Sequence, residues 1–130
     1  VGNARGAMEE AMNYAGERNA FNKPIIRHQA ISFMLADMAT KIEAARMLVW
    51  KAALKADSGE RNTLEAAHAK RFAADMAMEV TTDAVQIFGG YGYSEEYPVA
   101  RRMRGAKVVQ IFEGSSQIQR LIISREMLRN

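Results

Sequence analysis

The chain has 130 residues, of which 48% are hydrophobic and 25% charged, with a formal net charge of +3. That size and balance indicate one globular domain with a hydrophobic core of its own. The absence of cysteine excludes a disulfide framework, a thiolate metal site and a cysteine nucleophile, and it fits a cytoplasmic location. Basic residues are scattered among acidic ones, which argues against a nucleic-acid partner. No apolar run approaches the roughly 18 residues of a membrane span, so we expect none.

The first half of the chain predicts two helices separated by a break. Apolar residues share one face over residues 2–19, which is typical of a helix. The break falls at residues 22–24, because proline removes a donor and disfavours helix at the residue before it. From residue 25 to about residue 56 apolar positions recur every three or four residues, which predicts a long amphipathic helix. Residues 57–59 form a turn.

The second half begins with a third long helix. Asn62 followed by Glu65 has the spacing of a capping box, so the helix is expected to start there. It is expected to stop at the glycines at positions 89 and 90. Pro98 then fits the first position of a short helix over residues 98–104.

The last segment contains a link and a terminal helix. Gly105 is expected to lie just after the short helix, and the apolar residues 108–112 to form an extended link. Ser115 or Ser116 is expected to cap a helix through about residue 129, since Gln119 follows Ser116 at capping-box spacing. The pattern as a whole predicts an all-α fold, an antiparallel helical bundle.

One carboxylate has a position suited to chemistry. Glu113 stands between apolar residues and a helix start, where it can be partly desolvated and still reach a ligand, as a general base requires. The alternative is a surface glutamate favoured by the helix dipole. Gly114 would let a ligand approach the backbone. His28 and His68 lie on different predicted helices without partner ligands, so we expect no metal site.

Several segments, in order and at the right spacing, resemble the C-terminal helical domain of the acyl-CoA dehydrogenases. They are residues 18–24, 28–38, 58–63, 86–93, 97–99, 103–107 and 110–121. Residues 58–63 look most like the medium-chain branch. The resemblance implies that residues 1–130 are a single C-terminal domain. The N-terminal helical domain and the middle β domain of the family are absent, so we expect a fragment that is inactive alone.

The resemblance also implies a reaction and a set of sites. In an FAD-dependent enzyme of fatty acid metabolism, Glu113 would take the α proton of an acyl-CoA thioester while a hydride from the β carbon goes to the flavin. Gly114 would let the thioester lie close. The positions that match flavin contacts are Arg18, Phe21, His28, Gln29, Gln86, Ile87, Phe88, Gly89, Gly90, Ser115, Ser116 and Gln117. The positions that match approaches to coenzyme A are Arg61, Thr63 and Arg125.

The implied partners are an electron-transferring flavoprotein and further copies of the chain, in a dimer or tetramer. Some of the flavin contacts would reach a flavin held by a neighbouring subunit. Three residues depart from the family pattern: Asn22 replaces a glycine, Phe112 a tyrosine and Gly105 an aspartate. We expect the loss of the tyrosine hydroxyl to have a modest effect, and the loss of the aspartate to change the partner of Arg102 or Arg104.

Two other functions fit the same residues. One is a stand-alone helical interaction module that keeps the fold without catalysis, and an upstream extension of the reading frame would argue against it. The other is an acyl-CoA oxidase, in which oxygen reoxidises the flavin. We expect the 130-residue chain to fold alone without holding FAD, and to self-associate through faces that further domains would cover.

Overall fold

The computed structural model describes residues 1–129 and is built almost entirely of helices, which confirms the all-α prediction. The α-helices are α1 (Gly2–Glu17), α2 (Gln29–Asp57), α3 (Thr63–Phe88), α4 (Gly90–Tyr93), α5 (Pro98–Val109) and α6 (Ser116–Met127). Between α1 and α2 lie the two-residue strands β1 (Asn19–Ala20) and β2 (Lys23–Pro24), followed by a 3-10 turn, η1 (Ile25–Arg27).

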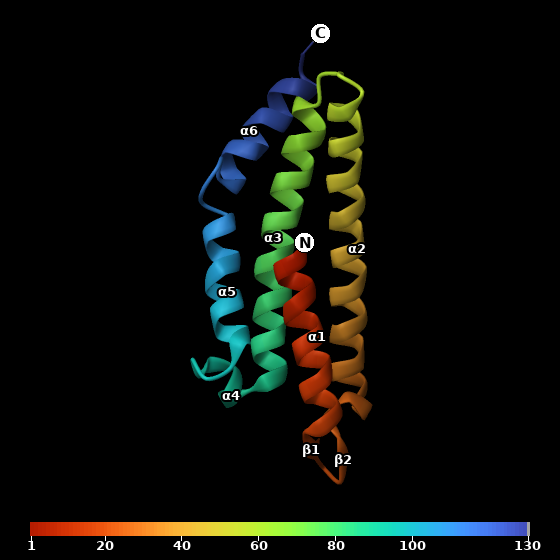
Figure 1. The fold of residues 1–130 in the computed structure, drawn as a ribbon, viewed down its shortest axis with the longest axis vertical. Coiled ribbons are helices and arrows are strands. Elements are labelled where there is room, and N and C mark those ends of the chain that lie inside the picture. The colour runs from red at the N-terminus through yellow and green to blue at the C-terminus, as the bar shows by residue number, and fades with distance from the viewer. Residues whose placement is uncertain (130) are drawn as a thin grey trace.

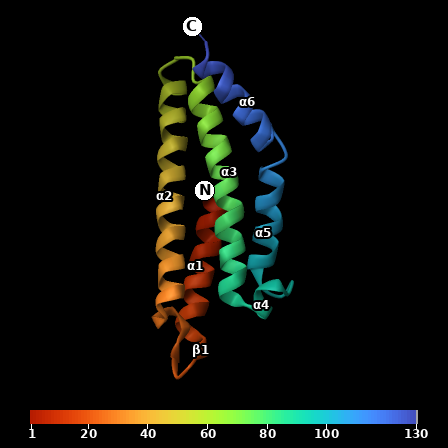
Figure 2. The ribbon, with the colours of Figure 1, turned by 180° about the vertical axis from the view of Figure 1, so that it is seen from behind.

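The helices form an antiparallel bundle centred on α3, as Figures 1 and 2 show. Helix α3 contacts α1, α2, α5 and α6, and α2 runs antiparallel beside it. Helix α5 lies along the half of α3 nearest the β1–β2 hairpin, and α6 lies along the half nearest the α2–α3 turn. Among residues 1–129 no helix combines the length and the apolar character that crossing a bilayer requires.

The core begins with a row of alanines on α1. Ala4, Ala7, Ala11 and Ala15 recur at helical spacing, and all four are fully buried. Their small side chains let α1 pack closely against its neighbours. Larger side chains from α2 and α3 fill the remaining space, namely Met38, Ile42, Met76, Val80 and Ile87.

The break after α1 is a hairpin, which the sequence did not predict. Asn19 pairs with Pro24 across the two strands. The turn residues Phe21 and Asn22 have positive φ angles of 53° and 64°, as in a two-residue hairpin turn of type I′. Asparagine tolerates this conformation, which explains how Asn22 can stand where glycine is usual. The predicted second helix is present, but its predicted start at residue 25 is wrong, because η1 intervenes and α2 starts at Gln29.

Helix α3 starts and ends where predicted, with Asn62 at its N-cap position and Gly89 after its last residue. Gly89 ends it with a φ angle of 62°. The predicted capping box does not form: the Asn62 amide donates to the Ala52 carbonyl at 3.2 Å. The Glu65 carboxylate accepts from Lys55 Nζ at 2.8 Å. Both side chains tie α3 to α2, and these contacts replace the local cap.

The predicted stop at Gly105 and the predicted extended link over residues 108–112 are both wrong, because α5 continues to Val109. Ala106 is fully buried in the core, and packing outweighs the roughly 1 kcal/mol that a glycine costs inside a helix. At the start of α6, Ser115 is the cap, and its hydroxyl accepts from the Ile118 N–H at 3.4 Å.

Candidate active site

The loop between α5 and α6 presents the candidate base. Glu113 and Gly114 have successive positive φ angles of 54° and 89°, so the chain turns sharply at these two residues. The Glu113 side chain is exposed. Within residues 1–129 it makes no hydrogen bond or ion pair. The partial desolvation expected for this carboxylate is therefore not supplied by the residues described.

Gly114 cannot carry a side chain without rearrangement. A Cβ atom at this position would lie 2.5 Å from Gln119 Nε2. That amide nitrogen donates to the Gly114 carbonyl at 3.2 Å, and Gln119 is buried. The left-handed backbone and the close amide together explain glycine beside the candidate base.

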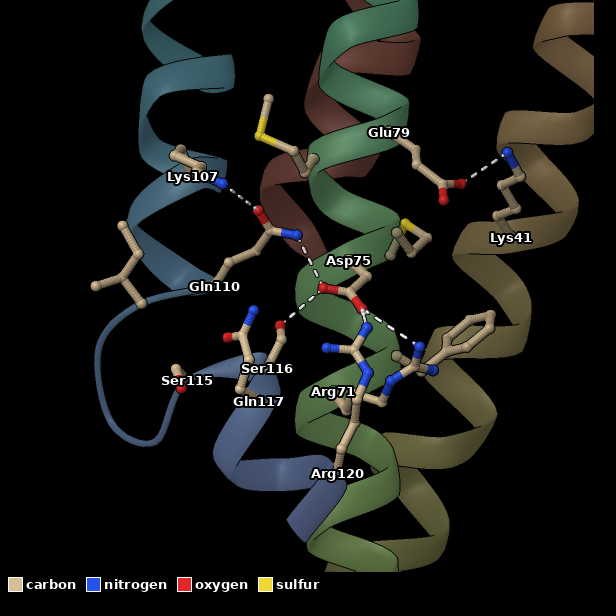
Figure 3. Close-up of a pocket in the computed structure, with 14 residues that line it drawn as sticks. Lys41, Arg71, Asp75, Glu79, Lys107, Gln110, Ser115, Ser116, Gln117 and Arg120 are labelled. Carbon is tan, nitrogen blue, oxygen red and sulfur yellow. Dashed lines mark hydrogen bonds and ion pairs between the residues drawn. The ribbon is translucent and has the colours of Figure 1, made fainter. Parts of the chain in front are cut away.

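A carboxylate of α3 holds both ends of this loop (Figure 3). Asp75 Oδ1 accepts from Gln110 Nε2 at 2.8 Å and from Ser116 Oγ at 2.7 Å. Asp75 Oδ2 faces Arg120 Nη2 at 3.3 Å and Arg71 Nη2 at 3.6 Å. Burial would raise the pKa of Asp75, but the hydrogen bonds from Ser116 and Gln110 and the two arginines outweigh it, so the pKa lies below its ordinary value.

A cavity of about 840 Å³ opens around Asp75. Its wall includes Ser115, Ser116 and Gln117, three of the residues expected to contact flavin. The charged side chains that line it are Lys41, Arg71, Lys107, Arg120, Asp75 and Glu79. Cations outnumber carboxylates in this wall, so the cavity favours an anionic ligand.

Lys70 of α3 holds the same loop on the side of α5. Its Nζ donates to the Val109 carbonyl at 2.8 Å. The same ammonium lies 4.6 Å from the centroid of the Phe112 ring, within the range of a cation–π contact. Because Phe112 precedes Glu113, α3 contacts the loop on both sides of the candidate base.

A second group of expected flavin contacts gathers at the hairpin end of the bundle. Five of them line one hollow of about 610 Å³, namely Arg18, Ile87, Phe88, Gly89 and Gly90. The Arg18 guanidinium also lies 5.9 Å from the centroid of Tyr91. A Cβ atom built at Gly89 or at Gly90 would meet nothing within 4 Å, so a ligand can approach the backbone there.

Four other expected contacts lie outside this hollow. Phe21 is 89% exposed and packs edge-on against His28, with 6.0 Å between the ring centroids. His28 Nε2 lies 3.0 Å from the Ala20 carbonyl oxygen. Gln29 is the first residue of α2, and Gln86 is exposed near the end of α3.

The residues expected to approach coenzyme A lie at the opposite end, beside the α2–α3 turn. Arg61 Nε donates to Thr63 Oγ1 at 3.3 Å, and Arg61 Nη2 donates to Glu126 Oε1 at 2.6 Å. Arg125 is exposed on α6 next to this pair. The structure thus brings Arg61 and Thr63 together, and it occupies the arginine with a carboxylate that the sequence did not indicate.

The expected site residues therefore form three groups along the bundle. The path along α3 from Asp75, beside the Glu113 loop, to Phe88, beside the second group, is about 20 Å at about 1.5 Å per residue. Sequence reasoning missed Asp75, Gln110 and Lys70. The one available signal was a carboxylate between two apolar residues, Ala74 and Met76, which the structure shows to be buried. Within residues 1–129, histidine, cysteine, aspartate and glutamate form no group of three that could hold a metal ion.

These features define a helical domain that carries a candidate general base on the loop between its last two helices. Residues 1–128 match the family described as "Acyl-CoA dehydrogenase, C-terminal domain", and the chain belongs to this family. It is 53% identical over 129 residues to the cyclohexane-1-carbonyl-CoA dehydrogenase of Geobacter metallireducens, covering 99% of this chain and 34% of the relative. The chain thus spans about a third of the length of the curated relatives it matches.

Two solved structures contain chains of the same fold. Butyryl-CoA dehydrogenase from Megasphaera elsdenii is 55% identical, with a TM-score of 0.97 over 98% of this chain and 33% of that chain. A chain in the solved structure of the electron transferring flavoprotein of Acidaminococcus fermentans is also 55% identical. Its TM-score is 0.97 over 99% of this chain and 34% of that chain.

Proposed function

We propose that this chain is the C-terminal domain of a longer FAD-dependent acyl-CoA dehydrogenase, with Glu113 as the catalytic base. The observation that carries the proposal is the position of Glu113, at the tip of a loop that α3 holds at both ends. Its carboxylate is exposed on this domain and has no partner within residues 1–129, so it is available to a substrate.

In this proposal the carboxylate of Glu113 accepts the α proton of an acyl-CoA thioester. That proton is weakly acidic, so the thioester carbonyl must be polarised by hydrogen-bond donors as the proton leaves. The backbone N–H of Glu113 makes no hydrogen bond within residues 1–129 and can serve as one donor. Gly114 carries no side chain that would keep the thioester from the backbone. The other domains of the longer protein would exclude water around Glu113 and supply its desolvation.

The residues present fit a flavin nucleotide at two places. The hollow at the hairpin end offers the cation of Arg18 beside the open backbone of Gly89 and Gly90, and arginine suits a phosphate. Ser115 and Gln117 offer polar side chains next to the base. When bound, FAD would accept the hydride from the β carbon of the substrate. Because the two places are about 20 Å apart along α3, we assign the hairpin-end group to a flavin of a neighbouring copy in a dimer or tetramer.

Coenzyme A is proposed to lie near Arg61, Thr63 and Arg125. In the domain described here, Arg61 already pairs with Glu126 at 2.6 Å. A phosphate that binds this arginine must therefore share it with Glu126 or displace that carboxylate. Arg61 is half-exposed, and the Glu126 carboxylate also faces Arg129 Nη1 at 3.8 Å, so a phosphate can take Arg61 without leaving that carboxylate unpaired.

We propose a short acyl chain rather than a medium one as the preferred substrate. The support is the similarity to the butyryl-CoA and cyclohexane-1-carbonyl-CoA dehydrogenases, whereas the likeness to the medium-chain branch rests on residues 58–63. The similarity to a chain in an electron transferring flavoprotein structure supports such a flavoprotein as the electron acceptor.

The experiment that tests this function uses the purified longer protein. Saturated acyl-CoAs from butyryl-CoA to palmitoyl-CoA are supplied with an artificial electron acceptor, and bound flavin is measured by absorbance. We expect stoichiometric FAD and the highest kcat/KM with butyryl-CoA. A protein without flavin, or with flavin that no acyl-CoA reduces, would contradict the proposal.

A further inference from the structure

The loop that carries Glu113 is short and closed at its ends. Helix α5 ends at Val109 and α6 begins at Ser116, so residues 110–115 connect them. The Ser116 N–H donates to the Gln110 carbonyl at 3.1 Å, which joins the two ends directly. Since the ends are fixed to each other, whatever fixes them to the bundle also fixes the position of Glu113.

One carboxylate oxygen on α3 accepts hydrogen bonds from both ends of the loop. Asp75 Oδ1 accepts from Gln110 Nε2 at 2.8 Å and from Ser116 Oγ at 2.7 Å. The Ser116 side chain is buried, with 4% of the residue exposed, so water cannot easily replace its bond. The other oxygen, Oδ2, faces the guanidinium groups of Arg120 and Arg71, which hold the carboxylate in this orientation.

The group at position 75 must accept from two loop donors on one side and face two guanidinium groups on the other. A carboxylate does this better than any neutral side chain. It accepts at both oxygens and donates at neither. An asparagine in its place could keep the bonds to Gln110 and Ser116 through its carbonyl oxygen. Its amide group would then point donor hydrogens at the two arginines, which are donors themselves. If the amide turned so that its oxygen faced the arginines, its NH2 group would face Gln110 Nε2 and Ser116 Oγ, which are also donors.

We propose that Asp75 is a positioning residue, which fixes the ends of the α5–α6 loop so that the Glu113 carboxylate meets the substrate carbon in one place. The inference rests on the proposed function, because a fixed loop matters to turnover only if Glu113 is the base. It adds to that function a residue on another helix, 38 positions away in the sequence, that acts through the loop ends it holds.

The expected kinetic effect follows from the geometry of proton transfer. A general base must lie within hydrogen-bond reach of the proton it abstracts. Displacement by about 1 Å costs on the order of 100-fold in rate. Loosening the loop should therefore lower kcat by about 10- to 100-fold. KM for the acyl-CoA should change little, since none of the residues proposed for coenzyme A is bonded to Asp75.

The test compares Asp75→Asn with Asp83→Asn in the longer flavin-loaded protein. Asp83 lies two turns further along α3 and is half-buried, and within the described residues it makes no hydrogen bond with the loop. Two readouts are taken: flavin reduction over a range of butyryl-CoA concentrations, which gives kcat and KM, and amide hydrogen exchange without substrate. The N–H groups of Ser116, Ile118 and Gln119 are hydrogen-bonded within the loop and report on its opening.

For Asp75→Asn we expect faster exchange at these three amides by about tenfold or more, with the amides of α1 and of residues 76–88 unchanged. We also expect a lower kcat with KM retained, and no change in either readout for Asp83→Asn. Exchange that rises throughout the bundle would overturn the proposal, because it would show a general structural role. Faster loop exchange with parental turnover would overturn it too.

The exchange readout separates this proposal from the function it rests on. This readout needs no turnover. Unchanged loop exchange in Asp75→Asn would therefore refute the proposal that Asp75 fixes the loop ends, even in an inactive protein. Loss of the proposed function would appear instead as normal flavin reduction in a Glu113→Gln variant. If Asp75→Asn does not fold, Gln110→Ala removes one of the two loop donors and leaves the carboxylate paired with the arginines. The same local rise in exchange is expected, and its absence would overturn the proposal.

Discussion

At the scale of single residues, the tip of the α5–α6 loop combines a reactive side chain with an unfavourable backbone. Glu113 has a φ angle of 54°, and a left-handed conformation costs roughly 1–2 kcal/mol for a residue with a Cβ atom. The neighbouring contacts of Asp75, Lys70 and Gln119 hold the loop in spite of that cost. Backbone strain at a candidate catalytic residue is consistent with a fixed position for its carboxylate.

Gly114→Ala should destabilise this domain by about 1–3 kcal/mol. The alanine would have to adopt a positive φ of 89°, and its methyl group would lie 2.5 Å from Gln119 Nε2. Urea unfolding of the 130-residue chain measures the loss. The matched control is Gly16→Ala in α1, where a Cβ atom meets nothing within 4 Å and φ is not positive. That variant should be neutral or slightly stabilised, and equal effects in the two variants would contradict the explanation.

The residues of the site were predictable to different degrees. Glu113 and Gly114 stand in a segment that resembles a known family, and the sequence alone locates them. Asp75 could not be found in this way, because only the packing of α3 against α5 and α6 brings it to Gln110 and Ser116. The pairing of Arg61 with Glu126, 65 residues later, was hidden for the same reason.

At the scale of elements, the sequence predicted that the helices exist better than it predicted where they end. Periodicity located α1, α2 and α3 because their apolar faces pack over many turns. The wrong ends are the start of α2, where η1 intervenes, and the end of α5, where burial carries the helix through Gly105. At the start of α3 the position is right, but Asn62 and Glu65 bond distant partners and form no capping box. Local capping rules do not include such tertiary contacts.

Asp75 should also make the packing of α5 and α6 against α3 sensitive to acid. Its pKa in the folded domain lies below the ordinary value, because the bonds from Ser116 and Gln110 and the charges of Arg71 and Arg120 outweigh burial. A lowered pKa means that its stabilising effect is complete above the pKa of an unfolded chain and is lost as pH falls through the folded value.

The parental domain should have a larger free energy of unfolding than Asp75→Asn at neutral pH, and this difference should shrink as pH falls from about 5. Free energies of unfolding in urea, measured for both chains at several pH values, give this difference directly. A difference that stays constant down to acid pH would show that the carboxylate charge does not stabilise this packing.

At the scale of the whole molecule, the three groups of expected site residues lie apart along one bundle. The Glu113 loop, the Arg18 hollow and the Arg61 cluster lie at different positions along the bundle, and the cavity beside the loop shares no lining residue with the Arg18 hollow. Such an arrangement suits a domain that completes its sites with other domains and with other copies of itself.

Self-association of the 130-residue chain is the prediction at this scale. Phe33, Trp50 and Leu54 on α2 are 60%, 57% and 69% exposed, and exposed apolar groups of this size favour association. Sedimentation at increasing concentration should show dimers or larger species. Replacing Leu54 by Glu should weaken association by about tenfold or more, and Glu60→Gln, an exposed change beyond the end of α2, should not. A chain that sediments as a monomer at every concentration would oppose this prediction.

The most direct measurement is stopped-flow reduction of the flavin in the longer protein with Glu113→Gln. Glutamine keeps the shape of the side chain and removes the proton acceptor, while Glu96→Gln changes another exposed glutamate as the control. If Glu113 is the base, folding and flavin content should be retained and the rate of reduction by butyryl-CoA should fall by about 10²–10⁴-fold. The Glu96→Gln protein should match the parent. A Glu113→Gln protein that reduces its flavin at close to the parental rate would contradict the assignment and place the base elsewhere.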